Sequence, residues 1–81
     1  MDNHIYVNVS YWENKSLLGF QAVIKTRELN RIRMILFVMD KLVGKKGESP
    51  VMDMFMATPE QVEYAKQGFC EYIEHHSAAV S

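Results

Sequence analysis

The sequence is short of cysteine and of long apolar runs, and each shortage excludes a class of protein. Cys70 is the only cysteine among 81 residues, so no disulfide can form within the chain. The longest apolar run, from Met34 to Met39, is far below the roughly 18 residues that span a bilayer. The first residues lack the basic start and apolar stretch of a signal peptide. We therefore expect a cytoplasmic protein that has no membrane partner.

The sequence also lacks the motifs that bind phosphate or activate a nucleophile. Its four glycines are scattered, and the segment 44–47 lacks the glycine spacing and the Ser or Thr of a phosphate-binding loop. No cysteine-hydrolase motif surrounds Cys70. We expect no catalytic residue and no cofactor, so the chain is not predicted to be an enzyme.

One cluster near the C-terminal end contains residue types that bind metals. Its members are Cys70, Glu71, Glu74, His75 and His76. On a helix, adjacent histidines point about 100° apart, whereas structural zinc needs four ligands that converge on one point. We therefore expect no metal site here.

The composition is that of one small globular domain. Apolar residues make up 48% of the chain and charged residues 23%, which excludes a wholly disordered protein. We expect a single domain over 1–81, with a frayed end at 77–81. The net charge of −1 conceals an asymmetry, since residues 1–47 hold eight of the nine Lys and Arg and residues 48–81 hold six of the ten acids. The two halves therefore present opposite charge.

Alternating apolar residues predict a β-hairpin at the start of the chain. Apolar and polar residues alternate over 4–12, as they do on a half-buried strand. The four residues from Glu13 to Ser16 provide turn chemistry, because Asn14 tolerates a positive φ. A second alternating run follows over 17–25.

Two helices and a short strand are predicted after the hairpin. Thr26 is a candidate cap for a helix over 27–43, where apolar residues recur at spacings of three and four. The alternation over 51–57 favours a strand, although so short a segment leaves a helix open. The sequence Thr-Pro-Glu-Gln that follows is a capping box, and it predicts a second helix over 59–76.

These elements predict an α+β fold with the order β-β-α-β-α. A right-handed crossover through the first helix would lay the third strand beside the first. The expected architecture is a two-layer sandwich, in which a three-stranded antiparallel sheet of order 2-1-3 carries both helices on one face.

The first predicted helix is apolar on two opposite sides. On a helical wheel, Ile32 and Leu36 lie at the centre of the expected core face. Six residues occupy the opposite face, where an apolar centre is flanked by basic side chains: Met34, Phe37, Val38, Arg27, Arg31 and Lys41. Either the second helix covers this face internally, or the face is the partner-binding surface of a protein interface.

Two further surfaces are candidates for partner binding. The second helix is predicted to carry an acidic stripe, formed by Glu60, Glu63, Glu71 and Glu74. Such a stripe is either a solvated face or a means of steering towards a basic partner. If both helices cover one face of the sheet, Tyr6 and Trp12 lie on the open face, and a homodimer would bury them.

The sequence therefore favours a non-enzymatic protein-binding module that forms a homodimer, with a protein partner that the sequence does not identify. Small accessory proteins of phages and mobile elements that inhibit or modulate a larger host complex share this outward description. The first alternative is a nucleic-acid-binding or transcriptional regulator that uses the basic residues of the first helix. The second alternative is a structural or assembly dimer.

Overall fold

The computed structural model describes residues 2–44 and 48–76, and its longest feature is the predicted hairpin. Strand β1, Asn3–Glu13, pairs in antiparallel register with β2, Ser16–Thr26. Asn14 and Lys15 form the two-residue connection and both have positive φ, at 50° and 66°. This backbone suits the right-handed twist of the flanking strands. The hairpin prediction is confirmed.

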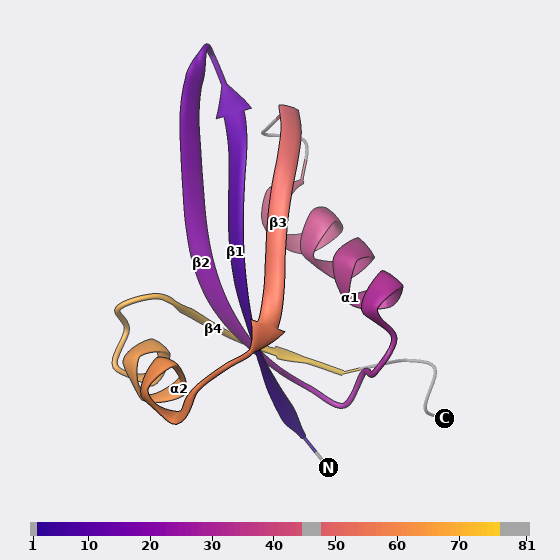
Figure 1. Ribbon diagram of the computed structural model, residues 1–81, viewed down its shortest axis with the longest axis vertical. Helices are drawn as coiled ribbons and strands as arrows, with labels where there is room; N and C mark the ends of the chain where they lie inside the picture. Colours follow the sequence, from indigo (N-terminus) through magenta and orange to yellow (C-terminus); the bar gives the residue numbers. More distant parts are fainter. Residues whose placement is uncertain (1, 45–47, 77–81) are drawn as a thin grey trace.

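Two more strands extend the hairpin into a four-stranded mixed sheet of order β3-β1-β2-β4 (Figure 1). Strand β3, Glu48–Met56, is antiparallel to β1, as the sequence predicted. Strand β4, Glu71–His75, is parallel to β2, and the sequence did not predict it. The predicted order of the first three strands is therefore correct, whereas the prediction of a three-stranded, purely antiparallel sheet is wrong.

The predicted second helix over 59–76 is wrong in its C-terminal half. Helix α2, Pro59–Lys66, begins at the predicted capping box, in which Thr58 and Gln61 bond each other's backbone N–H. It ends because Gly68 takes a φ of +92°, while the N–H groups of Gly68 and Phe69 donate to the carbonyls of Ala65 and Tyr64. This is the bonding pattern of a glycine-terminated helix.

Helix α1, Arg31–Val38, starts four residues later than predicted and continues as one wider turn, η1, over Met39–Val43. Its cap is Asn30, whose side-chain oxygen accepts from the N–H groups of Ile32 and Arg33. Thr26 does not cap a helix. It ends β2, where its buried hydroxyl accepts from the Glu28 N–H and is 2.8 Å from Nδ1 of His75. The predicted helix end before Gly44 is confirmed.

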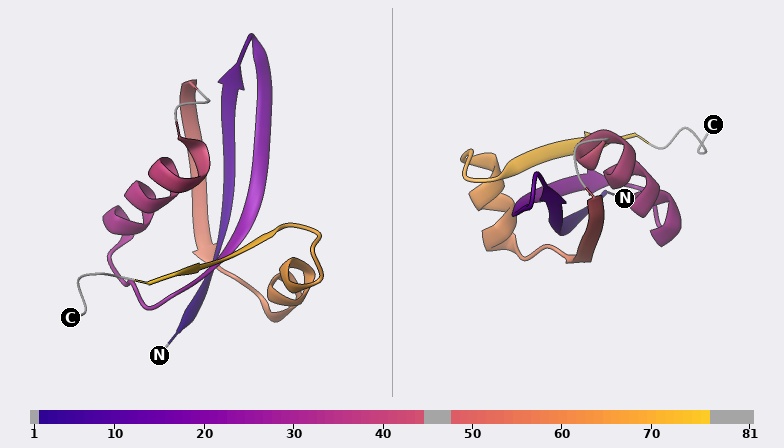
Figure 2. Two further views of the ribbon diagram at one scale, coloured as in Figure 1. Left: turned by 180° about the vertical axis from the view of Figure 1, so that it is seen from behind. Right: turned by 90° about the horizontal axis from the view of Figure 1, so that it is seen from above.

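The two helices lie on opposite faces of the sheet, which corrects the prediction of a two-layer sandwich with both on one face. Met34 and Val38 of α1 pack against Val7 and Ile24, whereas α2 lies over the face that carries Tyr6. Figure 2 shows α1 and α2 on either side of the strands. The crossovers through α1 and α2 run in opposite directions across the sheet, so right-handed connections require opposite faces. The frayed end predicted for 77–81 lies outside the described residues.

Candidate functional site

Helix α1 and the segment just before it expose three large aliphatic side chains. Leu29 is 83% exposed, Ile32 68% and Leu36 62%. Ile32 and Leu36 are one turn apart on the helix and share its outer face, and Leu29 lies two residues before the helix begins. We call these three residues the aliphatic stripe. Ile32 and Leu36 were predicted to face the core, so the helix is turned about its axis by roughly half a revolution from the predicted orientation.

The apolar residues predicted to bind a partner instead form part of the core. Met34 and Val38 are buried against the sheet. Phe37 is partly buried, and its ring centroid is 4.3 Å from that of His75 on β4. These three side chains are therefore covered by other residues of the same chain, and it is the sheet that covers them rather than α2. Their predicted place in an interface is not retained.

Two of the three predicted basic residues around α1, Arg27 and Lys41, form local ion pairs. Asp2 accepts a hydrogen bond from Nε of Arg27 at 3.0 Å, and it lies 3.7 Å from Nζ of Lys25. The bond from Arg27 is the main reason that the pKa of Asp2 lies below its ordinary value. Lys41 is 3.8 Å from the carboxylate of Asp40. These acids offset much of the positive charge that a phosphate backbone would need.

Arg31 lies away from these pairs, at the edge of a small depression between the start of α1 and β3. The depression has a volume of about 230 Å³, and Leu29, Met54 and Met56 also line it. Glu28 lines it as well, so the depression combines one guanidinium and one carboxylate with several apolar side chains, and it shares Leu29 with the aliphatic stripe. Such a combination resembles the rim of a protein interface more than a phosphate site.

The predicted acidic stripe does not form, because its four members lie on two different elements. Glu60 and Glu63 lie on α2, whereas Glu71 and Glu74 lie on β4. Glu71 and Glu74 are three positions apart on a strand, so they point to opposite faces of the sheet. The prediction failed because it extended the helix through Gly68.

The two aromatic residues predicted on the open sheet face are separated. Tyr6 stacks on Phe55 of the neighbouring strand, with ring centroids 5.1 Å apart. Trp12 is opposite Leu17 near the far end of the hairpin, and both are about half exposed. Tyr6 and Trp12 lie six residues apart on β1, and Met34 and Val38 are buried, so the structure offers no single surface that joins all the predicted partner residues.

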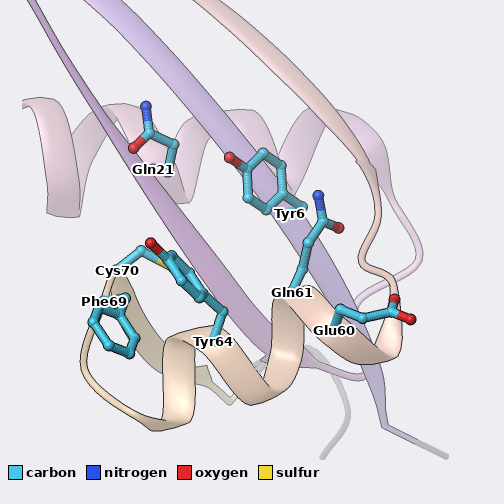
Figure 3. Close-up of a pocket in the computed structure, with 7 residues that line it drawn as sticks. All are labelled: Tyr6, Gln21, Glu60, Gln61, Tyr64, Phe69 and Cys70. Atoms are coloured by element: carbon cyan, nitrogen blue, oxygen red, sulfur yellow. The ribbon is translucent and has the colours of Figure 1, made fainter.

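A hollow of about 350 Å³ lies between α2 and the sheet (Figure 3). Seven residues line it: Tyr6, Gln21, Glu60, Gln61, Tyr64, Phe69 and Cys70. Burial, and then the nearby Glu71 carboxylate, raise the pKa of the Cys70 thiol, which opposes formation of a thiolate. The Glu60 carboxylate points away from Cys70, and the other described lining residues provide no His or Lys as a base (Figure 3).

Comparisons of the chain with protein-family models, with curated proteins and with solved structures found no match. Within residues 2–44 and 48–76, no helix is long and apolar enough to cross a membrane. Over the same residues, no group of three His, Cys, Asp or Glu side chains is placed to hold a metal ion. The aliphatic stripe contains Leu29, which has the highest fractional exposure among the large apolar side chains of the described residues.

Proposed function

We propose that the chain is a non-enzymatic protein-binding module and that the aliphatic stripe on α1 is its contact surface. The exposure of Leu29, Ile32 and Leu36 supports this proposal more than any other observation. Exposed aliphatic side chains that gather on one helix face are typical of binding surfaces, whereas single exposed ones are common on any protein. A helix that presents such a face is also a recurrent means of recognising protein partners.

The surroundings of the stripe suit a protein partner better than a nucleic acid. Arg33 and Glu28 form an ion pair at 3.5 Å, and Asp40 and Lys41 form another at 3.8 Å. Both signs of charge therefore flank an apolar centre, which is the usual arrangement of an interface core and its polar rim. Binding that depends on the stripe should persist at high salt, whereas binding to phosphates weakens steeply as salt rises.

An affinity purification with two matched variants tests this function. Ile32→Asp places a charge in the stripe, and Leu17→Asp places the same charge at a similarly exposed position on the hairpin. Both variants should keep the thermal unfolding midpoint of the parent within a few degrees, because both side chains are mostly exposed. We expect the parent and Leu17→Asp, but not Ile32→Asp, to retain the same bound protein at high salt. Equal retention by all three proteins would refute the role of the stripe.

A further inference from the structure

We propose that a second copy of this chain binds the aliphatic stripe, with the two α1 helices packed antiparallel about a two-fold axis. This inference rests on the function proposed above and names the occupant of the same surface. Two oppositely charged residues point to self-recognition. Arg33 lies between Ile32 and Leu36 in the sequence and Asp40 follows Leu36 by four residues, and their side chains are 54% and 79% exposed.

The positions of Arg33 and Asp40 make α1 complementary to itself. Arg33 lies on α1 and Asp40 on the wider turn η1, seven residues later, which is a little less than two helical turns. Both therefore lie on the same side of the Ile32–Leu36 line, roughly 10 Å apart along the axis. A two-fold axis perpendicular to the helices reverses their direction but keeps this side facing itself. Arg33 of each copy then lies opposite Asp40 of the other copy. In a parallel pair the axis runs along the helices and places the charged sides of the two copies on opposite sides of the contact, so no pair of this kind forms.

The apolar centre of this arrangement is also symmetric. With the axis near Leu36, the two Leu36 side chains meet at the centre and Ile32 of each copy packs beside them. Contact there removes water from four aliphatic side chains that are mostly exposed in one copy. The two Arg33–Asp40 pairs lie at the ends of the contact, where they set the antiparallel orientation and add little affinity.

The charges at the stripe already have partners within the chain, and the proposed pairing extends them. The guanidinium of Arg33 is 3.5 Å from Glu28, and Asp40 is 3.8 Å from Lys41. In the dimer each ion pair would gain one oppositely charged neighbour from the second copy, which forms a four-residue network at each end. Such networks contribute more than isolated surface pairs do.

The shortness of α1 limits the strength of this dimer. The described helical segment runs from Arg31 to Val43, and one face of two such segments buries less than the roughly 1,200 Å² of a standard interface. We therefore expect a weak dimer, with a dissociation constant on the order of 10–100 µM. A search for the dimer must cover concentrations up to about 1 mM, well above that range.

Reversing the charge of Arg33 or of Asp40 tests whether the two residues face each other across the two-fold axis. Residues with only a structural role would not recover association when the two variants are mixed. Arg33→Asp creates two Asp–Asp contacts across the axis, and Asp40→Arg creates two Arg–Arg contacts. Each variant alone should associate at least about tenfold more weakly than the parent, measured by light scattering and sedimentation over the concentration series. An equimolar mixture of the two variants should recover the association of the parent, because every cross-axis pair in the mixed dimer again joins opposite charges. The double variant should recover it as well.

The outcomes separate this inference from the proposed function. A parent that stays monomeric at about 1 mM, or a mixture that fails to recover association, overturns the antiparallel dimer. A dimer that survives Ile32→Asp but is lost in Trp12→Asp also overturns it, since its interface would lie on the sheet. In each of these cases, loss of a bound protein on Ile32→Asp would still support the stripe as a surface for a different partner.

Discussion

Replacing Val38 and Leu36 by alanine, one at a time, tests which side of α1 faces the core. Val38 is fully buried, so its truncation removes two buried carbon groups worth about 0.8 kcal/mol each and leaves a small cavity. Alanine is the better helix former, which offsets part of that loss. We expect Val38→Ala to lower the free energy of unfolding by about 2 kcal/mol. Leu36→Ala should lower it by less than about 1 kcal/mol, because the side chain is mostly in water already.

The assay is urea denaturation of the parent and both variants, followed by far-ultraviolet circular dichroism. The free energy of unfolding should fall with an unchanged slope against urea concentration, so that the midpoints give the difference directly. The helical wheel drawn from the sequence gives the opposite ranking, because it places Leu36 in the core, where truncation costs about 2–5 kcal/mol. If Leu36→Ala lowered the free energy of unfolding more than Val38→Ala, the orientation of α1 would be refuted. Leu36 would then face the core, and the aliphatic stripe would not be an exposed surface.

Three further predictions concern single polar groups. Thr26→Val keeps the shape of a buried side chain but removes its hydrogen bonds, including the one with His75, so we expect a loss of about 1–3 kcal/mol in urea unfolding. The depressed pKa of Asp2 means that its bond from Arg27 stabilises the fold above pH about 4 and is lost as pH falls through the folded-state pKa. The stability difference between the parent and Asp2→Asn should therefore disappear in strong acid. The raised pKa of Cys70 predicts slower alkylation at pH 8 than that of a thiol in an unfolded control, and equal rates would contradict the burial of its sulfur.

The sheet could be predicted from the sequence where local patterns and turn chemistry agree. The alternation in β1 and β2 and the turn at Asn14 and Lys15 each specify the same hairpin, so no tertiary information was needed. Strand β3 was also predicted, although its seven alternating residues alone favoured a strand only weakly. Agreement between independent local signals made these elements predictable.

The face of α1 could not be predicted because both of its sides are apolar. Ile32 and Leu36 on one side match Met34 and Val38 on the other in spacing and in hydrophobicity. Periodicity can show that such a helix is amphipathic or buried, but it cannot choose between two apolar faces. The choice depends on how residues 27–30 leave β2 and bring α1 to the sheet, and this is a tertiary property. The candidate site was therefore missed, since it lies on the face that was assigned to the core.

Strand β4 was missed because a helical spacing of apolar residues continues past Gly68. The stop signal was present, since Gly68 follows Lys66 by two residues, and Tyr64 and Phe69 are spaced as the apolar pair of a glycine-terminated helix. These two rings stack with centroids 4.6 Å apart. Beyond that point, residues 71–75 show no alternation that would indicate a strand, because the apolar Tyr72 and Ile73 are adjacent and are followed by the polar Glu74 and His75.

Substitution of Gly68 by alanine distinguishes these two structures by the sign of its effect. In a helix that continued to residue 76, Gly68→Ala would stabilise the protein by roughly 0.5–1 kcal/mol. In the structure Gly68 has a φ of +92°, and apart from its chain neighbours no described residue has an atom within 4 Å of the added Cβ, so backbone strain alone should destabilise the fold by about 1–2 kcal/mol. Gly68→Asn is the matched control, and it should cost less because asparagine tolerates positive φ. A rise in the urea midpoint of Gly68→Ala would contradict the end of α2 and, with it, strand β4.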